Sequence, residues 1–160
     1  MGSNAVEVVA QEGISKNRTS DFFSALSNLR ENDNGKLAVL RRNVGCDLSE
    51  ARGISWFYGI LSRFNVGPCD EEIFFLVSTL FAWDKKAVEN PLNCSDDIGG
   101  SMRKLRQIAT NQDSVDRRFG LLLDSCLSPG DTREMAFRLR QTVKLLLSKE
   151  IPISYPRLLD

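Results

Sequence analysis

The 160-residue sequence predicts an all-α fold of two packed helical bundles. Apolar residues recur three and four positions apart through most of the chain, which is the spacing that places them on one face of a helix. No segment shows the strict apolar–polar alternation that is typical of a half-buried strand. The hydrophobic fraction of 42% allows a substantial core, and the charged fraction of 26% suits a solvated surface.

The first bundle is expected at residues 19–92. Residues 1–18 show no sustained apolar period and are expected to form a flexible N-terminal arm. The first helix then begins at Thr19 or Ser20, either of which can serve as its N-cap, and it ends near the turn-forming residues 32–35. Its core face is expected to carry Phe22, Phe23, Leu26 and Leu29.

Three further helices are expected in this bundle. A short helix at residues 36–43 turns Leu37 and Leu40 inward. A longer helix is expected at residues 47–64 and a central helix at residues 69–83, where apolar residues surround the whole axis. The buried residues of the longer helix are expected to be Ile54, Phe57, Tyr58, Leu61 and Phe64.

The second bundle is expected at residues 93–160, and the boundary between the bundles lies within a connection at residues 85–97 that contains several turn-forming residues. Helices are expected at residues 101–109 and 115–127, the latter with Ser114 as its N-cap. The inward side chains of the 115–127 helix are expected to be Phe119, Leu122, Leu123 and Cys126.

The last helix is expected at residues 131–147. Asp131 can serve as its N-cap with Glu134 three positions later, which is a capping box. Its core face carries Met135, Ala136, Leu139, Val143 and Leu146. The opposite face carries a row without any carboxylate, made of Arg133, Phe137, Arg140 and Lys144. Such a row is typical of a surface that faces phosphate groups, and a solvated amphipathic helix is the alternative explanation.

The charges are unevenly distributed, although the whole chain carries 21 basic and 21 acidic side chains. Residues 1–100 carry 10 Lys or Arg against 14 Asp or Glu, a formal charge of −4. Residues 101–160 carry 11 against 7, a formal charge of +4. This asymmetry predicts an anionic partner for the C-terminal part of the chain.

Several kinds of function find no support in the sequence. The chain has no histidine, which excludes histidine-based catalysis and histidine metal sites. Its four cysteines form no CxxC pair, so we expect reduced thiols in a cytoplasmic protein rather than a zinc site. There is no P-loop, dinucleotide-binding or GxSxG motif, and no apolar run long enough to span a membrane. We therefore expect neither enzymatic activity nor a cofactor.

Nine cations are candidate ligands of a nucleic-acid backbone and are called the basic track below. Arg117 and Arg118 lie in the first turns of a predicted helix, where the helix dipole disfavours cations, so a partner is indicated. Arg41 and Arg42 lie at a helix C-terminus, where the dipole favours cations, so a structural role is an open alternative. Arg138 projects from another edge of its helix and can instead pair with a carboxylate. The complete basic track is Arg41, Arg42, Arg103, Arg106, Arg117, Arg118, Arg138, Arg140 and Lys144.

The order of five short motifs resembles the CasB family, the small subunit of the type I-E CRISPR surveillance complex Cascade. NGKLAVLRR at residues 34–42 resembles the N-terminal signature of that family, and WFY follows at residues 56–58. The other three motifs are VDRRF at residues 115–119, AFRLRQ at residues 136–141 and YPRLLD at residues 155–160. Together they extend the resemblance over roughly residues 20–160.

The resemblance implies an all-helical protein of two bundles that has no enzymatic activity. It implies, as partners, the backbone and large subunits of Cascade, a second copy of the chain, the crRNA, the target DNA and the displaced DNA strand. The implied function is to support crRNA-guided target binding and to stabilise the R-loop in antiviral defence. A purely protein–protein scaffold, with its Arg residues in interfacial salt bridges, is the alternative.

Overall fold

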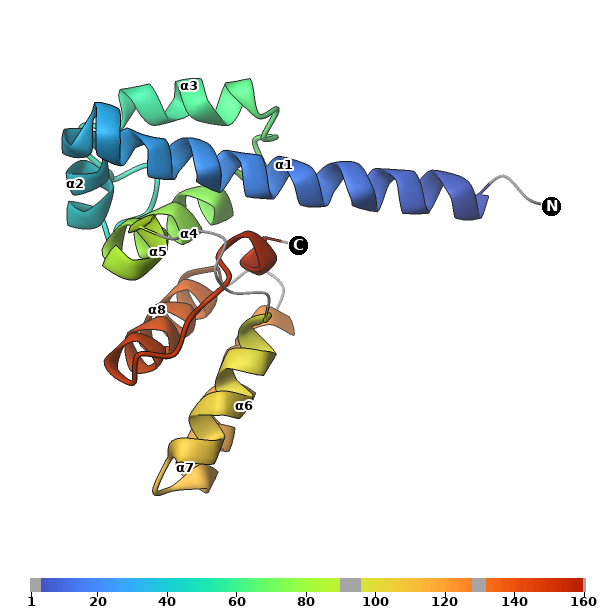
Figure 1. The fold of residues 1–160 in the computed structure, drawn as a ribbon, viewed down its shortest axis with the longest axis vertical. Helices are drawn as coiled ribbons and strands as arrows, with labels where there is room; N and C mark the ends of the chain where they lie inside the picture. Colours follow the sequence, from blue (N-terminus) through green and yellow to red (C-terminus); the bar gives the residue numbers. More distant parts are fainter. Residues whose placement is uncertain (1–3, 90–95, 128–131, 160) are drawn as a thin grey trace.

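The computed structural model describes residues 4–89, 96–127 and 132–159, with side chains described from Arg18 onward. Within these ranges the chain is all-α, as the sequence predicts, with eight α-helices, one short 3-10 helix and no strand (Figure 1). The helices are α1 (Asn4–Asn32), α2 (Asn34–Arg42), α3 (Ser55–Arg63), α4 (Glu71–Trp83), α5 (Lys85–Glu89), α6 (Ile98–Ile108), α7 (Gln112–Leu127), α8 (Thr132–Ser148) and η1 (Pro156–Leu158).

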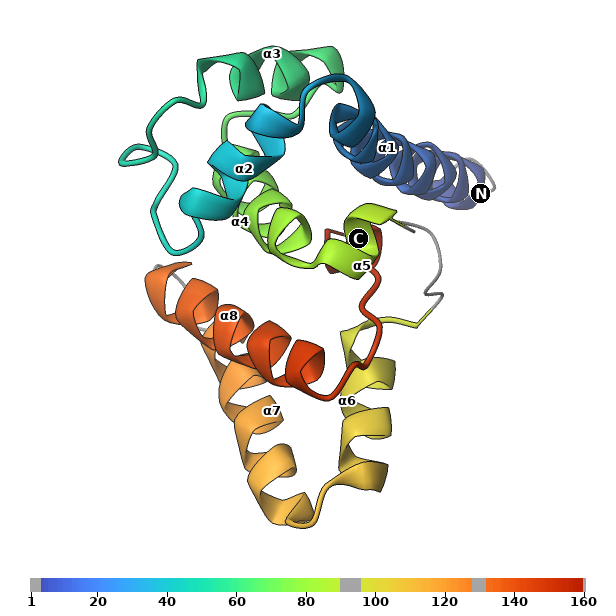
Figure 2. The ribbon, with the colours of Figure 1, turned by 60° about the vertical axis from the view of Figure 1, so that its left-hand side comes forward.

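Helices α1–α5 lie together on one side of the molecule, and α6–α8 lie together on the other (Figure 2). Helix α2 packs against α1 and α4, whereas α7 packs against α6 and α8. Helices α4 and α8 are in contact with each other, and η1 returns the chain to α1. The buried apolar residues of both groups belong to one cluster. A division into two bundles at residues 92 and 93 stays a prediction.

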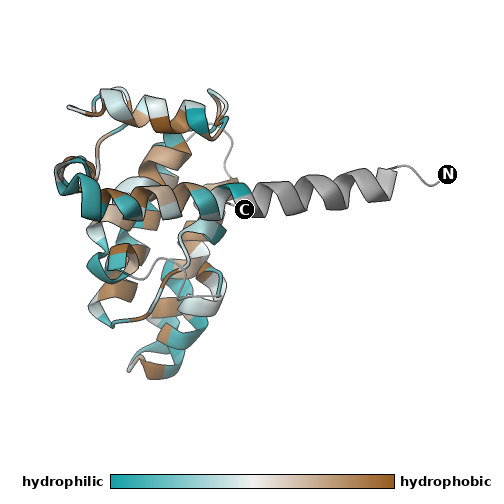
Figure 3. Ribbon diagram, turned by 45° about the horizontal axis from the view of Figure 1, so that its top comes forward, coloured by the Kyte–Doolittle hydropathy of each residue, from teal (hydrophilic) through white to brown (hydrophobic). Residues whose placement is uncertain are grey.

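Helix α4 lies at the centre of the core, as predicted, since its residues 74–82 are all buried. Phe22 of α1 contributes to the same core and makes edge-on contacts with neighbouring rings. Its ring centre lies 5.0 Å from that of Phe74 and 5.3 Å from that of Phe23. Such pairs contribute about 0.5–1.5 kcal/mol beyond the burial of their area. In Figure 3 the coloured helices carry both hydrophobic and hydrophilic residues, as expected of helices that surround a shared core.

Helix α1 begins at Asn4, so the predicted start at Thr19 or Ser20 is wrong. The absence of an apolar period in residues 1–18 does not exclude a helix. The hydrogen bonds of a helix join residues four apart whether or not one face is apolar. The core face of this helix is confirmed, since Phe22, Phe23 and Leu26 are fully buried and Leu29 packs against them. The flexibility expected of residues 1–18 stays a prediction.

Helix α3 begins only at Ser55, so the prediction of one helix over residues 47–64 is wrong. Gly53 has a φ of 73°, in the left-handed region that a helix cannot continue through. The side chain of Asn43 holds the preceding loop, because its Nδ2 donates to the Arg52 carbonyl and its Oδ1 accepts from the Arg52 N–H, both at 3.1 Å.

Among the core residues predicted for this segment, Ile54, Phe57 and Leu61 are buried and Phe64 is half-buried, but Tyr58 is 42% exposed.

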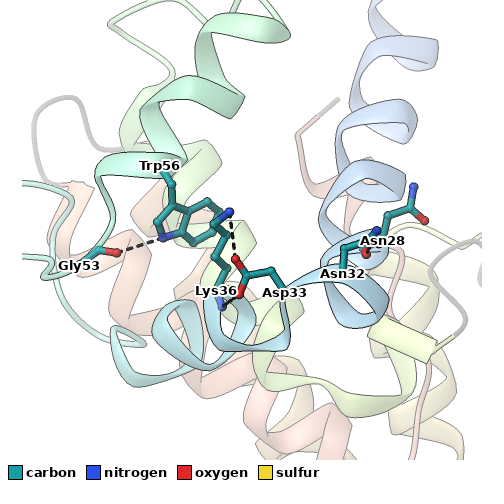
Figure 4. A network of polar contacts seen from close by, with 6 residues as sticks. All are labelled: Asn28, Asn32, Asp33, Lys36, Gly53 and Trp56. Carbon is teal, nitrogen blue, oxygen red and sulfur yellow. Dashed lines mark hydrogen bonds and ion pairs between the residues drawn. The ribbon is translucent and has the colours of Figure 1, made fainter.

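A small polar network joins the start of α2 to the start of α3 (Figure 4). Asp33 caps α2, because its Oδ1 accepts from the Lys36 N–H at 3.3 Å and its Oδ2 pairs with Lys36 Nζ at 3.0 Å. The same ammonium lies 5.7 Å from the centre of the Trp56 ring, whose Nε1 donates to the Gly53 carbonyl at 3.0 Å. The hydrogen bond from Lys36 is the main cause of the lowered pKa of Asp33. Two of the sequence motifs quoted above therefore meet in space.

Helix α5 lies inside the connection predicted at residues 85–97, which is a correction to the sequence reasoning. It forms because Oδ1 of the buried Asp84 accepts hydrogen bonds from the N–H groups of Lys86 and Ala87 and so caps the helix. Ala87 and Val88 are then buried against the core. Residues 90–95 of the predicted connection lie outside the described residues.

Two C-terminal helices also begin earlier than predicted. Helix α6 begins at Ile98, because the side chain of Asp97 accepts from the Gly100 N–H at 2.7 Å. Helix α7 begins at Gln112, where Asn111 rather than Ser114 supplies the capping oxygen, at 3.0 Å from the Ser114 nitrogen. The predicted N-cap of α8, Asp131, lies outside the described residues.

Helix α7 is buried along only one face. Leu122 is buried as predicted and Phe119 is half-buried, but Leu123 is 47% exposed and Cys126 is also exposed. The predicted inward positions of Leu123 and Cys126 are wrong, because α7 packs against α6 and α8 on one side and leaves its other side uncovered. In α8, Leu139, Val143 and Leu146 are buried as predicted, whereas Met135 and Ala136 are half-buried.

Residues 151–155 leave the helical path after α8, as expected, yet most of them are buried. The Tyr155 ring centre lies 5.6 Å from that of Phe81 and 6.4 Å from that of Phe23. The hydroxyl of Ser101 donates to the Pro152 carbonyl at 2.8 Å, which ties the segment to α6. This C-terminal segment therefore connects the two groups of helices through contacts of its own.

Candidate nucleic-acid interface

Seven of the nine residues of the basic track lie on α6, α7 and α8, three helices that pack against one another. Arg103 and Arg106 lie on α6, Arg117 and Arg118 on α7, and Arg138, Arg140 and Lys144 on α8. The other two, Arg41 and Arg42, lie at the end of α2. That all nine serve one nucleic acid stays a prediction.

Arg41 has a contact inside the fold. Its Nε donates to the Ala82 carbonyl at 3.0 Å, and its side chain is half-buried. Carbonyls in the last turn of a helix lack partners within that helix, so Arg41 satisfies one of those at the end of α4. The structural role that the sequence left open therefore applies to Arg41, whereas the neighbouring Arg42 is exposed.

Two other members of the basic track form ion pairs. Arg106 Nε lies 2.9 Å from Asp116 Oδ1 and 3.0 Å from Oδ2. Arg138 Nε lies 2.6 Å from Glu134 Oε1, one turn earlier on α8. Pairs this exposed stabilise a fold by only about 0.2–1 kcal/mol. They do place a carboxylate next to each guanidinium, which reduces the charge available to a phosphate.

Six members remain, and no ion pair joins any of them to a carboxylate of the described residues. They are Arg42, Arg103, Arg117, Arg118, Arg140 and Lys144, of which only Arg140 is half-buried and the rest are exposed. Because α7 begins at Gln112, Arg117 and Arg118 lie in its second turn. The helix dipole acts mainly within the first turn, so the dipole argument for these two residues is weaker than the sequence suggested.

One residue of the row on the outer face of α8 forms an ion pair within the fold. Arg133 Nε lies 3.4 Å from Oδ2 of Asp47, in the loop before α3, so a carboxylate from a distant segment pairs with this row. Phe137, in the middle of the row, is 45% exposed. Sequence periodicity identified the row correctly but could not show the partner of Arg133.

A hollow between α7 and α8 lies beside this row. It has a volume of about 270 Å³ and is lined by Arg118, Phe137, Arg138, Gln141 and Thr142. The guanidinium carbon of Arg138 lies 5.7 Å from the centre of the Phe137 ring, within range of a cation–π contact. The hollow therefore combines cations, an aromatic face and an amide.

A larger hollow of about 560 Å³ lies where α6 and α7 meet. Its lining includes Arg103, Arg106 and Arg157 but also Asp96, Asp97 and Asp116. A hydrogen bond from the Lys104 ammonium is the main reason that the pKa of Asp96 is lowered. Carboxylates and cations share this hollow, so its charge does not favour a phosphate.

Two arginines near the basic track were missed by the sequence reasoning. Arg52 lines a hollow of about 280 Å³ with Arg42, because the loop at Gly53 turns it back toward α2. The expectation of a continuous helix over residues 47–64 concealed this, although the glycine after Arg52 was a signal for a turn. Arg157 follows the buried Tyr155 and lines the larger hollow.

The described part of the chain holds no group of three or more Cys, Asp or Glu side chains arranged to bind a metal ion. Cys46, Cys69 and Cys126 are free thiols, and Cys94 lies outside the described residues. Among the helices that the structure describes, none is long and apolar enough to cross a bilayer.

The model of one protein family, described as CRISPR-associated protein Cse2, matches residues 36–160 of the chain. The matched region includes all nine residues of the basic track. No match was found among curated proteins or among solved structures.

Proposed function

Since the chain belongs to the CRISPR-associated Cse2 (CasB) family, whose members are non-catalytic small subunits of Cascade, we propose that it binds nucleic-acid backbone without reading sequence. In this role it supports crRNA-guided target binding and stabilises the R-loop during CRISPR defence.

The observation that carries this proposal is a group of cations on α7 and α8 that form no ion pair among the residues that the structure describes. Arg117, Arg118 and Lys144 are exposed and Arg140 is half-buried, and none of the four is ion-paired within the described part of the chain. Such side chains can contact phosphates without first breaking an internal pair. An Arg fork can also meet a phosphate through two parallel hydrogen bonds.

Contacts of this kind position a nucleic acid but do not select its sequence, because phosphates are the same at every step. Selection belongs to pairing between the guide and the target. R-loop formation is close to balanced in free energy, so a few backbone contacts by the protein are enough to favour it.

The partners in this proposal are the backbone and large subunits of Cascade, a second copy of the chain, the crRNA, the target DNA and the displaced strand. Residues 93–160 face the nucleic acid, because they hold seven of the nine residues of the basic track. Residues 19–92 form the other bundle and are free to contact protein subunits.

A salt series tests the proposal. Binding of the full chain to labelled single- and double-stranded DNA is measured by fluorescence anisotropy. The logarithm of the affinity should fall linearly with the logarithm of salt, by about 0.7 per phosphate contact on a single strand and about 0.9 on a duplex. Replacing Arg117, Arg118 and Arg140 by Ala should weaken binding equally for unrelated sequences and reduce the slope by about 2–3.

A matched control removes three exposed cations outside the basic track, Arg63, Lys85 and Lys149. It lowers the net charge equally and should leave the slope nearly unchanged. An unchanged slope in the folded Arg117, Arg118 and Arg140 variant would instead support the scaffold alternative. The Arg106–Asp116 and Arg133–Asp47 pairs favour that alternative, since they show cations of this chain meeting carboxylates.

A further inference from the structure

Phosphate contacts leave one feature of the α8 surface unexplained. Phe137 is 45% exposed and lies between Arg133 and Arg140 in the basic row. A phosphate has no apolar face, so it gives no reason for a phenyl ring at this position. Covering an exposed ring with another apolar or aromatic surface is favourable.

The ring forms one wall of the hollow of about 270 Å³ between α7 and α8. Pockets for drug-sized ligands measure roughly 300–1,000 Å³, so this hollow suits a smaller group. Of its other lining residues, Thr142 is buried, whereas Gln141 and Arg118 are exposed.

The side chains around this hollow match the parts of one nucleotide. The Phe137 ring can stack on a base, and the Gln141 amide can both donate to and accept from a base edge. Arg118 has no ion pair within the described ranges and can meet a phosphate. Arg138 has a different role, because Glu134 holds it at 2.6 Å and its guanidinium lies against the ring.

We infer that this hollow holds one unpaired nucleobase stacked on Phe137, with the adjacent phosphate on Arg118. The inference rests on the proposed function and names the form of nucleic acid that this site takes. Inside a duplex both faces of each base are covered by neighbouring bases, whereas an unpaired base can turn a face to the ring. Phe137 therefore makes the site favour single strands over duplexes.

An abasic strand tests this inference without changing the protein. Two single-stranded DNA probes of one length are compared by fluorescence anisotropy with the full wild-type chain, one with all of its bases and one that is abasic at every position. Their phosphates are the same in number. The normal strand should bind about 5-fold or more tightly, because losing one stacked base lowers affinity by about 5- to 150-fold.

Phe137→Leu should bring the affinity for the normal strand down to that for the abasic strand, while the salt slope stays unchanged. Tyr58→Leu is the matched control, because it removes the exposed ring of α3, which is 42% exposed, and should keep the discrimination. A strand carrying 5-iodouracil should also crosslink under ultraviolet light to the peptide that contains Phe137.

The outcomes separate the two proposals. Steep salt dependence with equal affinity for the two strands overturns the stacking site and leaves the proposed function standing. An absence of salt-dependent binding on either strand overturns both. If Phe137→Leu keeps the discrimination but no longer associates with other Cascade subunits, a protein surface covers the ring and the stacking site is again overturned.

Discussion

The hydroxyl of Tyr155 donates a hydrogen bond to Oδ2 of Asp84 at 3.1 Å, although the two residues are 71 positions apart in the chain. Both are buried, with 1% of Tyr155 and 7% of Asp84 exposed. The other oxygen of the carboxylate accepts from the N–H groups of Lys86 and Ala87. One buried side chain therefore caps α5 and also fixes the C-terminal segment.

Tyr155→Phe should lower the free energy of unfolding by about 1.5–3 kcal/mol, the usual range for a hydrogen bond to a charged group. The ring itself remains, so its contacts with Phe23 and Phe81 are kept. Urea unfolding followed by circular dichroism measures the change. Tyr58→Phe, at an exposed position, should stay within about 0.5 kcal/mol of the wild type. Equal effects of the two substitutions would contradict a stabilising role for the Asp84 contact.

Stability should also fall at alkaline pH through the same side chain. Burial, and secondarily the neighbouring Asp84 carboxylate, raise the pKa of Tyr155 well above its ordinary value of 10.0. Below pH 10 the phenol is neutral in both the folded and the unfolded chain, so its contribution is fully present. Above pH 10 the unfolded chain loses this proton first, so stability falls as pH rises toward the folded pKa, by up to about 1.4 kcal/mol per pH unit.

The difference between wild type and Tyr155→Phe isolates this effect from other groups that titrate in the same range. Urea unfolding at pH 9, 10 and 11 should show the two proteins becoming closer in stability as pH rises. A difference that stays constant from pH 9 to 11 would contradict the raised pKa.

Two neighbouring arginines of α2 should respond differently to substitution. Arg41→Ala removes the hydrogen bond to the Ala82 carbonyl and should cost about 1.5–3 kcal/mol of unfolding free energy, with little effect on DNA binding. Arg42→Ala should change stability by less than about 0.5 kcal/mol. If Arg42 contacts a phosphate, its loss should reduce the salt slope by about 0.7–0.9. Equal loss of binding in both variants would argue against the structural role of Arg41.

Removing the carboxylate from the ion pair between Arg106 and Asp116 should increase the affinity for DNA. Asp116→Asn should free the guanidinium of Arg106, strengthen DNA binding and increase the salt slope by about 0.7–0.9. Arg106→Gln should change the slope little, because Asp116 already balances its charge. Stability should change by at most about 1 kcal/mol in either variant, since the pair is half exposed. Anisotropy over a salt series distinguishes them, and weaker binding by Asp116→Asn would refute the idea that the pair limits Arg106.

The fold could be predicted where the apolar pattern within a single helix shows which of its residues are buried. Apolar residues on all sides identified α4, and the spacing of Leu37 and Leu40 identified the inner face of α2. Predictions were wrong where the backbone conformation of one residue, or a contact from another segment, determines where a helix begins. The helix expected over residues 47–64 is interrupted by the left-handed Gly53 and by hydrogen bonds from Asn43, which lies outside that segment.

The sequence could supply candidate cations, but it could not show which of them are paired within the fold. The position of Glu134 one turn before Arg138 could have shown from the sequence that these two side chains pair. The partner of Arg106 could not be found in this way, because Asp116 lies on the next helix. The exposure of Leu123 likewise depends on which sides of α7 are covered by other helices.

The buried position of Tyr155 has a consequence for biosynthesis. Ribosomes add about 5–20 residues per second, so the 71 positions between Asp84 and Tyr155 take roughly 4–14 s to translate. During that interval Phe23 and Phe81 have been made but lack the ring that covers them. A transcript with a premature stop codon just after α8 would encode α1–α8 and still leave this part of the core open to water.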